Sequence, residues 1–108
     1  MSVTTIQRGN ILHGNFVQVA IGANAIGANT TAEVSFTIPG ANTIEAVFAS
    51  FAGQQTAGIV IANAYVSASN TVKVVFANVT GSSANTAAGN MNFYIVRSEQ
   101  NPVPSSTI

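Results

Sequence analysis

Few side chains in this 108-residue chain could do acid–base, metal or nucleophilic chemistry. One histidine, three acidic residues and three basic residues make up the set, and cysteine is absent. Acid–base catalysis needs two ionisable groups held close together, and a zinc site needs several convergent nitrogen, sulfur or oxygen ligands. The seven residues are Arg8, His13, Glu33, Glu45, Lys73, Arg97 and Glu99.

The spacing of these residues predicts no active site. His13 stands beside Gly14 in a predicted loop with no neighbouring carboxylate or thiol, so we expect its ring to be exposed or to make a structural hydrogen bond. The three glutamates lie on separate segments, which does not favour a catalytic carboxylate pair. No Gly-x-Ser-x-Gly motif accompanies the many serines. We therefore expect no enzyme, no cofactor and no metal site.

Composition also limits the classes of partner. Only 6% of the residues are charged and the formal net charge is zero, whereas nucleic-acid binding needs clustered Lys and Arg. No apolar stretch approaches the roughly twenty residues that cross a bilayer, and residues 1–12 do not resemble a secretion signal. We expect no nucleic acid and no membrane as partners, and synthesis in a cytoplasm.

So few charges leave a free monomer with little electrostatic protection against association. Such a surface is tolerable when an assembly partner covers much of it. The alternative is a well-packed monomer that its Asn, Ser and Thr side chains keep solvated, and composition leaves both interpretations open.

Alternating hydrophobic residues predict β-strands. Residues 32–38 alternate before Pro39-Gly40 ends the segment. The alternation recurs over 71–76, and residues 59–66 should pair with it across a four-residue hairpin loop, Ser67–Asn70. The side chains expected to face the core from the second of these segments are Val72, Val74 and Phe76.

Further β-rich segments occur at 16–21, 44–51 and 91–96, and a weaker one at 3–12. Six or seven short strands with Gly-, Asn- and Ser-containing joints are typical of an antiparallel β-sandwich or a small barrel. Helix is poorly supported, because the segments rich in helix formers are short. We expect one all-β domain over residues 15–97, an N-terminal arm or edge strand over 1–14 and an extended tail over 98–108.

Outward-facing hydrophobic residues are candidates for an interface. If Val72, Val74 and Phe76 face the core, Val75 points outward. One face of the last strand must also lie outside, and we expect it to be the face of Tyr94 and Val96. Pro102 and Pro104 keep the tail from forming a central strand, so it is either a disordered end or an arm that orders on a neighbouring subunit or shell. The predicted subunit or capsid interface comprises Val75, Tyr94, Val96, Pro102 and Pro104.

Several stretches resemble small β-sandwich modules encoded among the virion structural genes of tailed bacteriophages. The resemblance spans residues 27–97, with Ile38 where valine is usual in the family and Ala41–Ile44 where a glycine-aspartate step is common. The stretches that carry it are Asn29-Thr30-Thr31-Ala32-Glu33, Phe36-Thr37-Ile38-Pro39-Gly40, the segment from Ala64 to Asn78, Ala87-Ala88-Gly89 and Phe93-Tyr94-Ile95-Val96-Arg97.

The resemblance implies a structural protein of the virion, most plausibly a head decoration subunit that cements the outer surface of the capsid. Its partners would be the major capsid protein and copies of itself, a trimer being one arrangement. The alternative is a tail or fibre-associated module that binds the host surface, for which Phe51, Gln54 and Gln55 would be a sparse glycan-binding cluster. Both interpretations place the protein in the virion, the first on the capsid surface.

Overall fold

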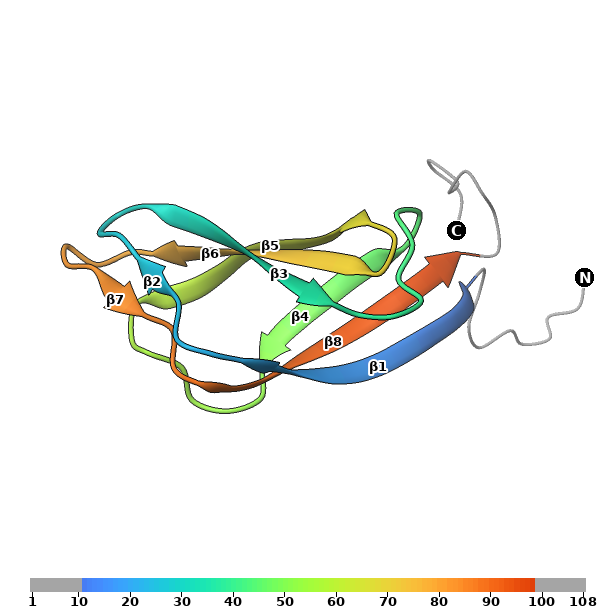
Figure 1. Cartoon of the computed structure of the whole chain (residues 1–108), viewed down its shortest axis with the longest axis horizontal. Coiled ribbons are helices and arrows are strands. Elements are labelled where there is room, and N and C mark those ends of the chain that lie inside the picture. The colour runs from blue at the N-terminus through green and yellow to red at the C-terminus, as the bar shows by residue number, and fades with distance from the viewer. Residues whose placement is uncertain (1–10, 99–108) are drawn as a thin grey trace, which may run out of the picture.

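The computed structural model describes residues 11–98, which form eight β-strands and no helix (Figure 1). The all-β prediction is therefore confirmed. The strands are β1 (Ile11–Ile21), β2 (Ala25–Ile26), β3 (Thr31–Thr37), β4 (Ala46–Phe51), β5 (Ile59–Ala68), β6 (Thr71–Asn78), β7 (Ala84–Asn85) and β8 (Gly89–Ser98).

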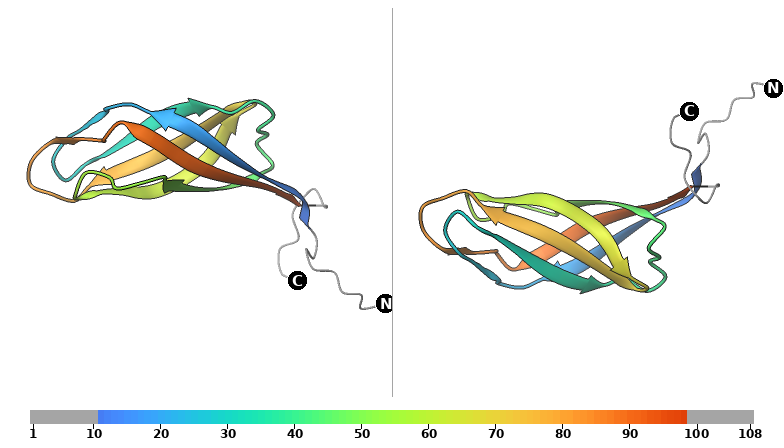
Figure 2. Two further views of the ribbon diagram at one scale, coloured as in Figure 1. Left: turned by 90° about the horizontal axis from the view of Figure 1, so that it is seen from below. Right: turned by 90° about the horizontal axis from the view of Figure 1, so that it is seen from above.

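All strand pairs are antiparallel, and they form three sheets. Sheet A has the order β1-β8-β4, sheet C the order β3-β6-β5, and β2 and β7 form the small sheet B. The sheets stay separate, so the small closed barrel considered from the sequence is not formed. Figure 2 shows sheets A and C as two layers, with sheet B at the end opposite to the start of β1 and the end of β8.

The core lies between sheets A and C. Phe36 of β3 contacts Phe93 of β8 with ring centroids 5.2 Å apart, and Phe51 of β4 stacks on Phe76 of β6 at 5.8 Å. These contacts join the layers through alternate residues of each strand, as period-two strands require. The inward residues predicted on β6 are confirmed, and β8 contributes its own buried row. The side chains of these two rows are Val72, Val74, Phe76, Met91, Phe93 and Ile95.

β1 is longer than the sequence predicted. It begins at Ile11, so the segment of His13 and Gly14 expected to be a loop is part of a strand. Its partner β8 explains the difference, since the pairing runs from Ile11 opposite Ser98 to Ile21 opposite Gly89. Residues 11–14, assigned from sequence to an arm or edge strand, thus begin an edge strand. Residues 3–10 of the weak predicted strand, and the tail beyond Ser98, lie outside the described residues.

The β5–β6 hairpin loop is shorter than predicted, with two residues in place of four. Asn70 adopts a left-handed backbone (φ 64°), which asparagine tolerates better than most residues. It also ties this turn to the loop after β3: its Oδ1 accepts a hydrogen bond from Gly40 N at 2.7 Å, and its N–H donates to the Ala41 carbonyl at 2.9 Å. The β5–β6 turn and the loop that leads from β3 to β4 therefore hold each other.

Phe93 provides a test of where stability resides. It is fully buried against Phe36, so Phe93→Ala should leave a cavity and lower the free energy of unfolding by about 3–5 kcal/mol. Phe48→Ala is the matched control, because Phe48 is 63% exposed and should cost less than about 1 kcal/mol. Urea denaturation followed by circular dichroism measures both. Equal losses for the two variants would contradict this core.

Candidate interaction surface

A row of three aromatic rings crosses the outer face of sheet A. Tyr94 on the central strand β8 lies opposite Phe16 of β1 on one side and Phe48 of β4 on the other. Each phenylalanine ring lies 6.4 Å from the Tyr94 ring, centroid to centroid. Phe16 is 71% exposed, Phe48 63% and Tyr94 40%. We call these three residues the aromatic row.

Gly14 lets the Tyr94 ring lie across β1. A Cβ at Gly14 would be 2.7 Å from Tyr94 Cζ and would also collide with the Tyr94 hydroxyl, so any side chain here would displace the ring. Gly14 pairs with Val96, which in turn pairs with Ala46. The aromatic row is therefore bordered on this side by small aliphatic residues.

Polar but uncharged side chains border the aromatic row on its other side. Asn92 of β8 lies between Gln18 of β1 and Ser50 of β4, and Gln18 Nε2 donates a hydrogen bond to Asn92 Oδ1 at 2.9 Å. A shallow depression of about 110 Å³ opens between the aromatic rings and these polar groups. The outward positions of β1, β8 and β4 carry no Lys, Arg, Asp or Glu. This face can make apolar, stacking and amide contacts, and it attracts no particular charge.

The predicted interface residues fall on two different sheets. Tyr94 is exposed and Val96 is half-buried on the outer face of sheet A, whereas Val75 is half-buried on β6 of sheet C. Since the two sheets pack inner face to inner face, Val75 cannot share one flat contact surface with Tyr94 and Val96. Pro102 and Pro104 lie outside the described residues. Alternation within residues 46–51 indicates that Phe48 faces outward. Its position beside Tyr94 follows only from the strand order, which the alternation does not predict.

The outer face of sheet C, unlike that of sheet A, carries charges. Tyr65 of β5 donates a hydrogen bond from its hydroxyl to Glu33 Oε2 at 2.7 Å, and Lys73 Nζ lies 3.7 Å from Glu33 Oε1. The hydrogen bond to Glu33 raises the pKa of Tyr65 above its ordinary value, with smaller contributions from desolvation and from the carboxylate charge.

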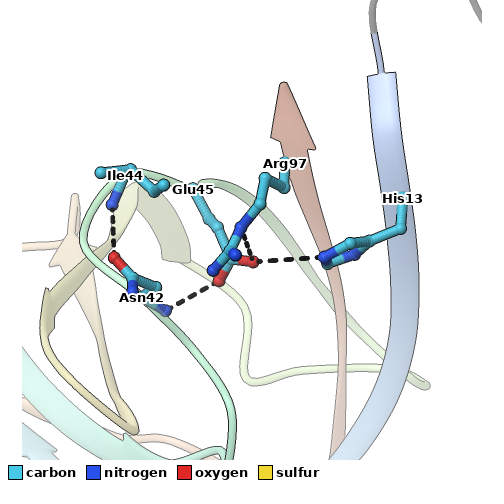
Figure 3. A network of polar contacts seen from close by, with 5 residues as sticks. All are labelled: His13, Asn42, Ile44, Glu45 and Arg97. Carbon is cyan, nitrogen blue, oxygen red and sulfur yellow. Dashed lines mark hydrogen bonds and ion pairs between the residues drawn. The ribbon is translucent and has the colours of Figure 1, made fainter. Parts of the chain in front are cut away.

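A buried carboxylate joins three segments at one end of sheet A (Figure 3). The Glu45 side chain is only 2% exposed, and it accepts hydrogen bonds from Arg97 Nε at 3.1 Å and from the backbone N–H of Asn42 at 2.7 Å. His13 Nε2 lies 4.0 Å from Glu45 Oε2. This network clamps the turn before β4 onto the paired ends of β1 and β8.

The position of His13 corrects the expectation from sequence that no carboxylate lies near it. Pairing of β1 with β8 places His13 opposite Arg97, and the turn before β4 brings Glu45 to both. Its ring is 40% exposed, while Nδ1 is buried without a hydrogen-bond partner. Residues 11–98 contain no group of three or more His, Cys, Asp or Glu side chains that could hold a metal ion. The arrangement is that of a structural clamp.

The two paired glutamates predict a contrast in stability. Glu45→Ala leaves Arg97 and the Asn42 N–H without their buried acceptor, so it should lower the free energy of unfolding by about 2–4 kcal/mol. Glu33→Ala breaks an exposed pair and should cost less than about 1 kcal/mol. Urea denaturation of both variants at neutral pH compares them. A larger loss for Glu33→Ala would show that the clamp is not structural.

Titration of Tyr65 tests the polar cluster on sheet C. In a Tyr94→Phe background Tyr65 is the remaining tyrosine, and Glu33→Ala, which removes the acceptor, should lower its pKa toward the ordinary value. Folding raises the pKa of Tyr65, so the neutral Tyr65 hydroxyl stabilises the folded protein. This contribution to stability is complete below the ordinary pKa of tyrosine and is lost as the pH rises through the raised pKa. Tyrosinate absorbance against pH measures the shift. An unchanged midpoint in the Glu33→Ala variant would contradict the hydrogen bond.

Comparison with known proteins adds no relative to this description. No protein-family model matches the chain, and searches of curated proteins and of solved structures returned no match. Among the described residues, no helix is long and apolar enough to cross a membrane. The likeness to phage virion modules therefore stays a prediction, and the geometry of the aromatic face is the main ground for a functional proposal.

Proposed function

We propose that this protein is a structural subunit of a tailed-bacteriophage particle, a small β-sandwich that decorates the head and cements its shell. The observation that carries the proposal is the uncharged outer face of sheet A with its aromatic row. Aromatic residues are enriched and charged residues depleted at the buried centres of protein interfaces. In this proposal the aromatic row docks on the major capsid protein.

The energetics suit a contact made many times. Burying an exposed phenylalanine contributes roughly 1.5–3 kcal/mol, so three rings supply a useful part of a moderate affinity. On a symmetric shell, contacts from many copies add up even when each is weak. A near-neutral surface lets copies of the chain lie close together without strong mutual repulsion. The proposal therefore includes copies of the chain among its partners, and neither nucleic acid nor membrane.

The fold gives this face a rigid support. The aromatic rings project from three adjacent strands whose opposite sides form the core, and the Glu45 clamp fixes the end of sheet A next to them. The start of β1 and the end of β8 lie together at one end of the molecule (Figure 1). Residues 1–10 and 99–108, with Pro102 and Pro104, connect there and would act as the arms that extend the contact.

A second candidate is a tail or fibre-associated module that binds host-surface glycans. The observation that favours it is the row of Gln18, Asn92 and Ser50 beside the aromatic rings. Stacking surfaces next to a few fixed polar groups are the features that orient small ligands such as sugars. The same face serves both candidates, so the location of the protein on the particle distinguishes them.

The experiment uses particles of the phage that carries this gene, prepared with the gene deleted. Purified protein is added back, unbound protein is removed by sedimentation, and immunogold electron microscopy locates the remainder. Head decoration predicts regularly spaced label on the head. Label confined to tail fibres would establish the second candidate, and unlabelled particles would contradict both.

Two matched variants test the docking face in the same assay. Phe48→Lys places a charge in the aromatic row and should reduce head binding at least about tenfold, because it buries an unpaired charge in the contact. Val75→Lys places the same charge on sheet C and should leave head binding unchanged. Loss of binding in Val75→Lys alone would assign the docking face to sheet C.

A further inference from the structure

The edges of the two large sheets differ in how they are protected against pairing with another chain. Sheets A and C have four edge strands, β1, β4, β3 and β5. The edges β4 and β5 lie against each other, so each shields its neighbour. β3 carries the acidic residue Glu33 and is followed by Ile38-Pro39. β1 is the longest edge strand, and within the described part of the chain no strand pairs with its outer edge.

β1 has only one of the features by which edge strands usually avoid pairing, a single register irregularity near its start. Those features are charges, prolines, bulges and short length. Residues 11–21 contain no Lys, Arg, Asp, Glu or Pro, and the register of β1 against β8 shifts only between Ile11 and His13. By contrast, β5 has two such irregularities along its pairing with β6. An extended, regular and uncharged edge is a template for another strand.

We propose that β1 pairs antiparallel with β1 of a second copy of this chain, forming a two-fold symmetric dimer. This inference specifies the self-association that the proposed function includes, and it can fail while head binding succeeds. The absence of like charges along β1 makes the strand compatible with its own copy, since no repulsive pair arises in any register. A two-fold axis makes each contact occur twice.

Strand geometry selects the register. Side chains that face each other across a sheet must lie on the same side of it, so residue numbers of paired positions must sum to an even number. Phe16 is the midpoint of β1, and pairing about it engages the regular stretch from His13 to Val19. Phe16 then faces Phe16 of the second copy, and Gly14 faces Gln18 of the second copy. The largest exposed side chain of the strand thereby gains an aromatic partner.

The dimer would join the outer faces of the two copies of sheet A into one surface. The strand order becomes β4-β8-β1-β1-β8-β4, and the two aromatic rows meet at the axis. At the usual strand spacing of about 4.8 Å, a stripe across six strands spans roughly 24 Å. Such a stripe offers a docked shell twice the aromatic area of one subunit in a single rigid sheet.

A cavity lies beside β1, where a second strand would be added. It has a volume of about 210 Å³ and opens between β1 and the loop that follows β3. Its lining is partly polar and includes Asn15 and Phe16 of β1, Ile38 and Pro39 of the loop, and Glu45. A strand added to the β1 edge would run along its mouth and cover both polar and apolar atoms that the monomer leaves accessible.

The expected strength is modest. A contact built on one strand pair falls in the small class of interfaces, which are weak or transient. We therefore expect a dissociation constant in the micromolar range or weaker, and dimers should accumulate only in concentrated solution or on a shell that holds subunits close together.

Sedimentation equilibrium and disulfide trapping test the pairing in the full-length chain. The chain has no cysteine, so a single introduced thiol reports one position. Phe16→Cys should form a disulfide-linked dimer under mild oxidation, because the two thiols would face each other across the axis. Phe48→Cys is the matched control, similarly exposed but on the opposite edge of sheet A, and should form no disulfide-linked dimer.

Lysine variants test the same strand pairing without a covalent bond between the two copies. Phe16→Lys should abolish the concentration-dependent dimer by placing like charges at the axis, and Phe48→Lys should dimerise as the unmodified chain does. Circular dichroism checks that both variants are folded. A chain that stays monomeric at millimolar concentration, forms a trimer, or is trapped equally well through Phe48→Cys would overturn the inference. Head binding by a monomeric chain would leave the proposed function standing.

Discussion

The alternation of side chains along β8 determines both the core and the candidate interface. β8 is the central strand of sheet A, with β1 and β4 hydrogen-bonded on either side. Its odd-numbered residues from Met91 to Ile95 are buried against sheet C, and its even-numbered residues from Asn92 to Val96 lie on the outer face. A one-residue slip in its register would exchange the two sets. The packing that stabilises the molecule therefore also fixes Tyr94 between Phe16 and Phe48.

Uncharged polar groups supply the specificity that charged groups provide in most domains. Asn78 is almost fully buried and donates hydrogen bonds to the carbonyls of Ile26 and Ser82, while Thr86 donates one to the carbonyl of Gly22. These bonds fasten the loops around sheet B without placing charge on the surface. Among residues 11–98, Glu45 is the one buried residue with a charged side chain. Arg97 forms an ion pair with it. The outer face of sheet A is consequently free of charge.

Local alternation was enough to predict an all-β chain and to divide β6 and β8 into two faces, because period two is a property of each strand by itself. Strand order was not predictable in this way. The network of His13, Glu45 and Arg97 depends on β8 lying between β1 and the turn before β4, and the aromatic row depends on the same order. Strand order also decides that Val75 and Tyr94, which both point outward as expected, do so from different sheets.

The central claim is that sheet A, with its aromatic row, is the side that contacts a larger assembly. A cryo-electron microscopy map of the decorated phage head tests it most directly, because the two faces of the molecule are chemically unlike. The account predicts that density for this chain lies on the shell with Phe16, Tyr94 and Phe48 against the capsid protein and the Glu33–Tyr65 pair toward solvent. A map with the aromatic row facing solvent would contradict it.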